Sequence, residues 1–234
     1  MSEIRDNLQT IGAKQDQYIK QYKRRGNSVQ LLAVSKRHSI DKIRDAYEYG
    51  QRSFGENYVQ ELLDKNQQLE DLAIDWHYIG PLQSNKAKKI SEVATWVHAV
   101  DRMKIAQRLS DNRPDDMPPL SICLQVNISE EESKSGINPN ELVPLAKQIA
   151  QLPKINLRGL MVIPAPEDDF NKQREVFAQV AALKESLKNS LNEEGIKIEL
   201  DTLSMGMSND MEAAIAEGAT IVRVGTAIFG QREI

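Results

Sequence analysis

One lysine, Lys36, stands where an amine could act as a nucleophile. It follows the apolar residues 31–34 and Ser35, so we expect it at the end of a buried strand. Partial burial disfavours the ammonium form and lowers the pKa of a lysine. A neutral amine can attack an aldehyde and form a Schiff base. A lysine that only extends into solvent would suit the same position, so Lys36 by itself leaves both interpretations open.

Two segments rich in glycine and hydroxyl side chains could bind an anion: SMGMSND at 204–210 and VGTAIFG at 224–230. Glycines let backbone N–H groups approach an anion closely, hydroxyls add donors, and a helix expected to begin near Asn209 adds its positive end. The same residue types are common in ordinary turns. The predicted donor residues are Gly206, Ser208, Gly225, Thr226 and Gly230.

The sequence contains no Gly-x-x-x-x-Gly-Lys motif, which argues against a nucleotide P-loop. An amine together with a phosphate site favours a small phosphorylated carbonyl compound, either a sugar phosphate or pyridoxal 5′-phosphate (PLP). Arg223 precedes Gly225 by two residues and therefore shares its face of a strand. An arginine inside a sheet needs an acceptor. A pyridine nitrogen and a carboxylate both qualify, so the residues leave that choice open.

The elements that would position these residues alternate between strands and helices. Strands followed by helices favour parallel pairing, and eight such units in this length match a (β/α)₈ barrel with its active site at the carboxyl ends of the strands. The alternative, an open doubly wound sheet, usually has a glycine-rich turn after its first strand, whereas this one ends in Ser35-Lys36-Arg37. The predicted strands are 30–34, 52–54, 76–79, 96–100, 120–126, 157–163, 199–204 and 221–224.

The helices between the strands have recognisable ends. Ser39 and Asn138 are predicted N-caps, and a Pro follows Asn138 at the first helical position. The longest helix is predicted at about 167–191, and Gly218 should end the last internal one. An extra amphipathic helix opens the chain, and we expect it to cover the amino-terminal mouth of the barrel.

Composition excludes several classes of protein. The 234 residues include 30 Lys and Arg against 34 Asp and Glu, a net charge of −4, which argues against general binding of nucleic acid or anionic membranes. A single cysteine excludes an internal disulfide and suits a reducing compartment. The three histidines lack the spacing of a metal site. We therefore expect a soluble, cytoplasmic, metal-free protein with one domain over residues 1–234.

Several motifs in order give the chain a family resemblance. It resembles the pyridoxal phosphate homeostasis proteins, single-domain barrels of the type III PLP-binding fold related to the N-terminal domain of bacterial alanine racemase. The motifs are LLAVSK at 31–36, FGENYVQE at 54–61, WHYIGPLQSNK at 76–86, VN at 126–127 with KSG at 134–136, RGLMVI at 158–163, LSMGMSNDMEAAI at 203–215 and RVGTAIFG at 223–230.

The resemblance assigns roles to individual residues. It implies that Lys36 forms the Schiff base and that Arg223 faces the pyridine nitrogen of PLP. Ser208, Gly225 and Thr226 would bind the phosphate. The other residues that it places near the ring, near the phosphate or along the pocket are Val34, Asn57, His77, Met161, Ser204, Met205 and Met207. No catalytic residue is implied.

The expected function follows from these assignments. An arginine cannot accept a proton, so the ring nitrogen would stay unprotonated and PLP would be a weak electron sink. The chain ends four residues after Gly230, so we expect no C-terminal β domain of the kind that racemases carry. The chain is therefore predicted to be a monomer that buffers or carries PLP for PLP-dependent apoenzymes. The alternatives are a stand-alone amino-acid racemase of low activity and a lysine-dependent aldolase acting on sugar phosphates.

Overall fold

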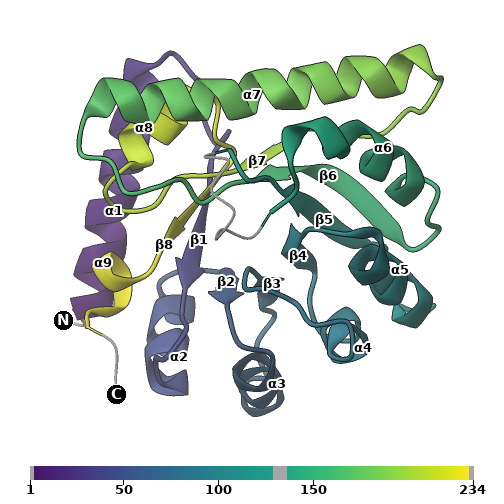
Figure 1. Cartoon of the computed structure of the whole chain (residues 1–234). Coiled ribbons are helices and arrows are strands. Elements are labelled where there is room, and N and C mark those ends of the chain that lie inside the picture. The colour runs from purple at the N-terminus through teal and green to yellow at the C-terminus, as the bar shows by residue number, and fades with distance from the viewer. Residues whose placement is uncertain (1–2, 129–135, 232–234) are drawn as a thin grey trace.

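The computed structural model describes residues 3–128 and 136–231 and contains a closed barrel of eight parallel strands. Each strand pairs with the next in sequence, and β8 pairs with β1 to close the sheet (Figure 1). The predicted (β/α)₈ fold is confirmed. The strands are β1 Gln30–Val34, β2 Ser53–Glu56, β3 Asp75–Tyr78, β4 Trp96–Val100, β5 Leu120–Gln125, β6 Ile155–Met161, β7 Thr202–Ser204 and β8 Ile221–Val224.

The strands are short apolar runs because both of their faces are buried. In β1, Leu32 and Val34 point into the barrel, whereas Ala33 between them packs in the layer beneath the helices. Two clusters fill the barrel interior, and their residues are Leu32, Val34, Ile79 and Ile221 in one and Ala99, Cys123 and Met161 in the other. Side-chain alternation thus separates an inner core from an outer one.

Helices surround the barrel, as Figure 1 shows. The N-cap prediction at Asn138 is confirmed, because its side chain accepts a hydrogen bond from the N–H of Asn140. Ser39 precedes α2 but makes no side-chain capping bond. The helices are α1 Glu3–Gln21, α2 Ile40–Glu48, α3 Val59–Gln68, α4 Ala87–Ser91, α5 Met103–Asn112, α6 Pro139–Ile149, α7 Phe170–Glu193, α8 Met211–Ala216 and α9 Thr226–Phe229. None within the described residues is long and apolar enough to cross a membrane.

Helix α1 lies elsewhere than expected. It packs against α8, α9 and α2, with Ile4, Ile11 and Ile19 buried, so it belongs to the outer ring and does not cover the amino-terminal mouth. Helix α9, which follows β8, has only four residues. The amphipathic first helix therefore covers the part of the barrel that a longer last helix would have covered. The Asn7 side chain connects the two helices by donating to the carbonyl oxygen of Ile228 over 3.0 Å.

Candidate functional site

A cavity of about 540 Å³ lies at the carboxyl ends of the strands, where this fold places its active sites. It is lined by segments that follow β1, β2, β3, β6, β7 and β8, by one face of α7 and by two buried strand residues, Val34 and Arg223. Eight of the twelve predicted cofactor residues line this cavity: Val34, Lys36, Asn57, Met207, Ser208, Arg223, Gly225 and Thr226.

The other four predicted residues are buried and do not line the cavity. His77, Met161 and Ser204 lie in the barrel strands, where their exposed fractions are 0%. Met205 belongs instead to the outer apolar layer that includes Met211 and Ala214. The physical reason is side-chain alternation, because Met205 follows the inward-facing Ser204 directly and so takes the opposite face.

Arg223 reaches the cavity from inside the barrel. Its Nη1 donates to the carbonyl oxygen of Ser204 over 2.6 Å and to the Ser204 hydroxyl over 2.8 Å, and its Nη2 donates to the carbonyl oxygen of Val162 over 2.8 Å. These bonds use three of the five N–H groups of a guanidinium. Burial lowers the pKa of Arg223 to about 10, so the group stays protonated near neutral pH. Its bonded acceptors are thus a hydroxyl and carbonyls, and no carboxylate among the described residues forms an ion pair with it.

A hydrogen-bonded chain continues from Arg223 through the barrel interior. The Ser204 hydroxyl lies 2.8 Å from Nδ1 of His98, and Nε2 of His98 lies 2.9 Å from Nδ1 of His77. Burial lowers the pKa of His77 to about 3 and that of His98 well below its usual 6.5, so both rings are neutral.

Each neutral ring carries one proton, so His98 donates at one of its two contacts and accepts at the other. The Ser204 hydroxyl accepts from Arg223 and makes its second contact with Nδ1 of His98. The last ring nitrogen of the series, Nε2 of His77, is buried and has no partner within the described part of the chain.

Lys36 lies in a tight turn directly after β1. The carbonyl oxygen of Ser35 accepts from the N–H of His38 over 3.1 Å, which closes the turn, and Arg37 within it has a φ of +59°. Lys36 is half-buried and lines the cavity, as the position after an apolar strand predicts. His38 also lines the cavity and packs on the ring of Phe229, with the ring centroids 5.1 Å apart.

The predicted anion-binding segments separate into two groups. Ser208, Gly225 and Thr226 line the cavity, and Thr226 begins α9, whose first N–H groups have no partners within the helix. Gly206 does not line the cavity: at φ +93° it packs against α8, where a Cβ would stand 2.5 Å from that of Ala214. Gly230 does not line it either.

One acidic residue lies among the predicted anion donors. Asp210 lines the cavity and accepts a hydrogen bond from the N–H of Met207. Burial raises the pKa of Asp210, which favours the neutral carboxyl. Helix α8 begins at Met211, so the helix start expected near Asn209 lies slightly later.

Sequence reasoning assigned no role to several residues that line the cavity. Residues 163–168 follow β6 and form one wall, and Phe177 of α7 closes it from behind. Their position after a predicted strand was the only available signal, because apolar and turn residues do not reveal a binding role. Of the KSG motif, Lys134 and Ser135 lie outside the described residues.

Comparison with known proteins shows what the chain is similar to. The family model for the alanine racemase N-terminal domain matches residues 13–233. The pyridoxal phosphate homeostasis protein of Pasteurella multocida is 49% identical over 232 residues, covering 98% of each chain. The protein of the same name from Pseudomonas aeruginosa is 50% identical over 233 residues, covering 100% of this chain and 97% of that one.

Solved structures agree with this similarity. PipY of Synechococcus elongatus with PLP bound is 38% identical, with a TM-score of 0.85 over 97% of this chain and 100% of that chain. The alanine racemase of Clostridium difficile has a TM-score of 0.71 over 99% of this chain and 57% of that chain. At 17% identity the latter shows a shared fold only.

Proposed function

The chain belongs to the alanine racemase N-terminal domain family, and we propose that it holds PLP as a Schiff base on Lys36 and acts in intracellular PLP homeostasis. It would buffer or carry the cofactor without robust catalysis. The printed names of its relatives and the PLP-bound PipY structure support PLP as the ligand. The recipients would be PLP-dependent apoenzymes in the cytoplasm, and the carrier would act as a monomer.

The convergence of three kinds of group on one cavity carries this proposal. A lysine amine comes from the turn after β1, a buried guanidinium from β8, and two hydroxyls from the segments after β7 and β8. A cavity of about 540 Å³ falls in the usual range for small-molecule sites. The arrangement fits a flat ring that carries an aldehyde and a phosphate.

The chemistry asked of Lys36 is limited. Its Nζ forms a double bond to the aldehyde carbon, and the carbonyl oxygen leaves as water with two protons from the amine. Ser208 and Thr226 would donate hydrogen bonds to the phosphate, together with the free N–H groups at the start of α9. Asp210 also lines the cavity, and burial raises the pKa of its carboxyl.

Arg223 supports a holding role over a catalytic one. PLP, when bound, supplies an electron sink for amino-acid chemistry, and that sink is strongest when its ring nitrogen is protonated. Arg223 remains protonated near neutral pH. Its unused N–H groups can donate a hydrogen bond to the ring nitrogen but do not transfer a proton to it. The ring nitrogen would therefore remain an acceptor, and the electron sink would be weak.

A low-activity racemase is the second candidate, favoured by one observation. His38 lines the same cavity as Lys36, and two residues in a cavity could act as the two bases that racemisation needs. Incubation of the PLP-loaded protein with each alanine enantiomer separates the two functions. Conversion of either enantiomer that is lost in Lys36→Ala would favour the racemase.

The main test is to locate the covalent bond. Purified protein is loaded with PLP, reduced with borohydride, digested and examined by mass spectrometry. We expect one modified residue, Lys36, and no fixed adduct in Lys36→Ala, which should still bind PLP without a covalent bond. A full adduct in Lys36→Ala would contradict the proposal.

A further inference from the structure

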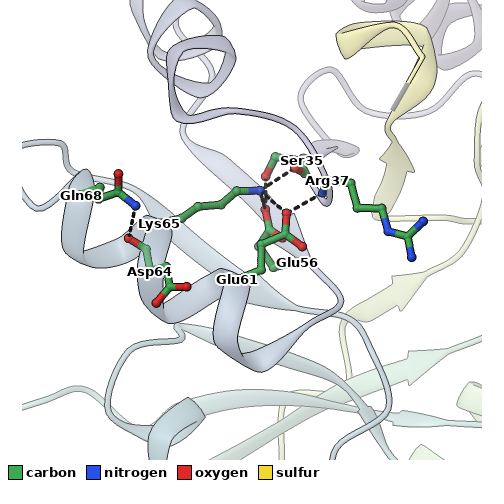
Figure 2. Close-up of polar contacts among 7 residues, drawn as sticks. All are labelled: Ser35, Arg37, Glu56, Glu61, Asp64, Lys65 and Gln68. Atoms are coloured by element: carbon green, nitrogen blue, oxygen red, sulfur yellow. Dashed lines mark hydrogen bonds and ion pairs between the residues drawn. The ribbon is translucent and has the colours of Figure 1, made fainter. Parts of the chain in front are cut away.

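A buried ammonium group lies beneath the turn that carries Lys36. Lys65 of α3 is 5% exposed, and its Nζ donates to the carbonyl oxygen of Ser35 over 2.7 Å (Figure 2). The same Nζ donates to Glu56 Oε1 over 2.8 Å and to Glu61 Oε1 over 2.7 Å. Three acceptors match the three N–H groups of an ammonium, so Lys65 is fully satisfied without water.

The two acids extend this contact to both neighbours of Lys36. The hydroxyl of Ser35 donates to Glu56 Oε1 over 2.6 Å, and the backbone N–H of Arg37 donates to Glu61 Oε1 over 2.5 Å. Figure 2 shows Lys65 and the two carboxylates between α3 and the turn. The residues before and after Lys36 are therefore both attached to one ionic cluster, defined here as Glu56, Glu61 and Lys65.

The turn needs such an attachment because its backbone is strained. Arg37 has a φ of +59°, a conformation that side-chain-bearing residues adopt rarely and at an energetic cost. The hydrogen bond to Glu61 holds the amide of this strained residue. Without it, the turn could relax and change the direction in which the Lys36 side chain leaves the backbone.

Charge makes Lys65 the essential member of the cluster. Glu56 is fully buried and its Oε2 has no hydrogen-bond partner among the described residues, so burial raises its pKa to about 7 despite the nearby ammonium. Removal of the ammonium would leave two carboxyl groups close together without a cation. Glu56 and Glu61 would then no longer hold the turn in one geometry.

We propose that Lys65 is a positioning residue for Lys36, acting through Ser35, Glu56, Glu61 and the Arg37 amide to aim the Lys36 amine at the ligand aldehyde. Lys65 does not line the cavity, so it does not contact the ligand itself. The inference rests on the proposed Schiff base at Lys36. Small displacements of a reacting group have large effects on bond formation, so the loss of Lys65 should affect the covalent step far more than the pocket.

The test compares a ligand that can form the imine with one that cannot. Lys65→Met keeps an unbranched side chain, one atom shorter, and removes its charge. Dissociation constants are measured for PLP and for pyridoxamine 5′-phosphate, which has the ring and phosphate but no aldehyde. We expect the PLP constant and the rate of visible imine absorbance to worsen by about tenfold or more, while the pyridoxamine 5′-phosphate constant changes less than about twofold.

Two further variants make the comparison specific. In a Lys36→Ala background, Lys65→Met should have no additional effect on PLP affinity, because the residue it positions is gone. Lys89→Met removes an exposed lysine of α4 and should leave both ligands unaffected. If Lys65→Met fails to fold, Glu61→Ala removes the acceptor of the Arg37 amide from a more exposed position and should cause the same selective loss, smaller in size.

Each contrary result is distinguishable. Equal losses of affinity for both ligands in Lys65→Met would show that Lys65 only maintains the fold. An unchanged dissociation constant for PLP would show that the turn does not need Lys65. Both results overturn the inference and leave the proposed function standing. A borohydride-fixed adduct in Lys36→Ala would instead overturn the proposed function, and this inference with it.

Discussion

The Ser204 hydroxyl lies 2.8 Å from Nη1 of Arg223 and 2.8 Å from Nδ1 of His98, and it thereby joins the guanidinium to the two buried histidines. Ser204 does not line the cavity, although its place in the family motif suggested contact with the ligand. Its side chain orients the arginine that does line it. Any effect of Ser204 on a ligand in the cavity would therefore pass through Arg223.

Ser204→Ala should cost about 1–3 kcal/mol of the free energy of unfolding, because Nδ1 of His98 loses its buried hydrogen-bond partner. Urea unfolding followed by circular dichroism measures this loss. Ser28→Ala is the matched control, since the buried Ser28 hydroxyl has no partner within the described ranges. Equal stability of the two variants would contradict the hydrogen-bonded chain.

The buried histidines predict a pH dependence of stability. Burial lowers the folded-state pKa of His77 to about 3 and also lowers that of His98. Below pH 6.5, the ordinary pKa of histidine, the unfolded chain therefore binds more protons than the folded chain. Their contribution to stability is present above pH 6.5 and is lost as the pH falls, at about 1.4 kcal/mol per pH unit for each ring. Urea unfolding at pH values between about 7 and 5 measures the slope.

Glu56 opposes this trend in the same window. Its folded pKa is raised from 4.5 to about 7, so the folded chain binds more protons there and gains stability as the pH falls. The net slope should therefore resemble that of about one histidine. His77→Gln should flatten it further. A His77→Gln slope equal to that of the parent would mean that His77 is not held neutral.

Thr226→Val should weaken the phosphate site and spare the amine. We expect the PLP dissociation constant to rise several-fold, corresponding to roughly 1 kcal/mol for one lost hydrogen bond. Pyridoxal, which lacks the phosphate, is the matched ligand and should bind the variant and the parent equally. A proportional loss for both ligands would place Thr226 outside the phosphate site.

Gly206→Ala should destabilise the barrel through packing as well as backbone strain. The position has a φ of +93°, and a Cβ would stand 2.5 Å from the Cβ of Ala214. Gly195→Ala separates the two effects, because Gly195 has a φ of +75° with open space around it. The Gly206 variant should lose about 1–3 kcal/mol more than the control. Thermal unfolding of both variants measures the two losses of stability. Equal losses would mean that backbone strain accounts for the whole effect at Gly206.

Local pattern determined the barrel and the residues at its mouth. The strands 30–34, 96–100 and 221–224 are read correctly because fully buried parallel strands are short apolar runs bounded by turn residues. Lys36 and Thr226 could be placed because they follow such runs directly, and a parallel barrel brings all carboxyl ends of its strands together. These are relationships between neighbours in the sequence.

Only the tertiary structure decided what lies behind the mouth. Lys65 has the helical spacing of the buried Leu62 and Leu69, but its charge would favour solvent, since charged residues are seldom buried. The structure places it against Ser35 and Glu56 beneath the Lys36 turn. The place of α1 in the outer ring depended on α9 being short. The series of hydrogen-bonded side chains from Arg223 to His77 involves four strands of the closed barrel. Contacts between residues far apart in sequence arise when the sheet closes, so no local pattern could have specified them.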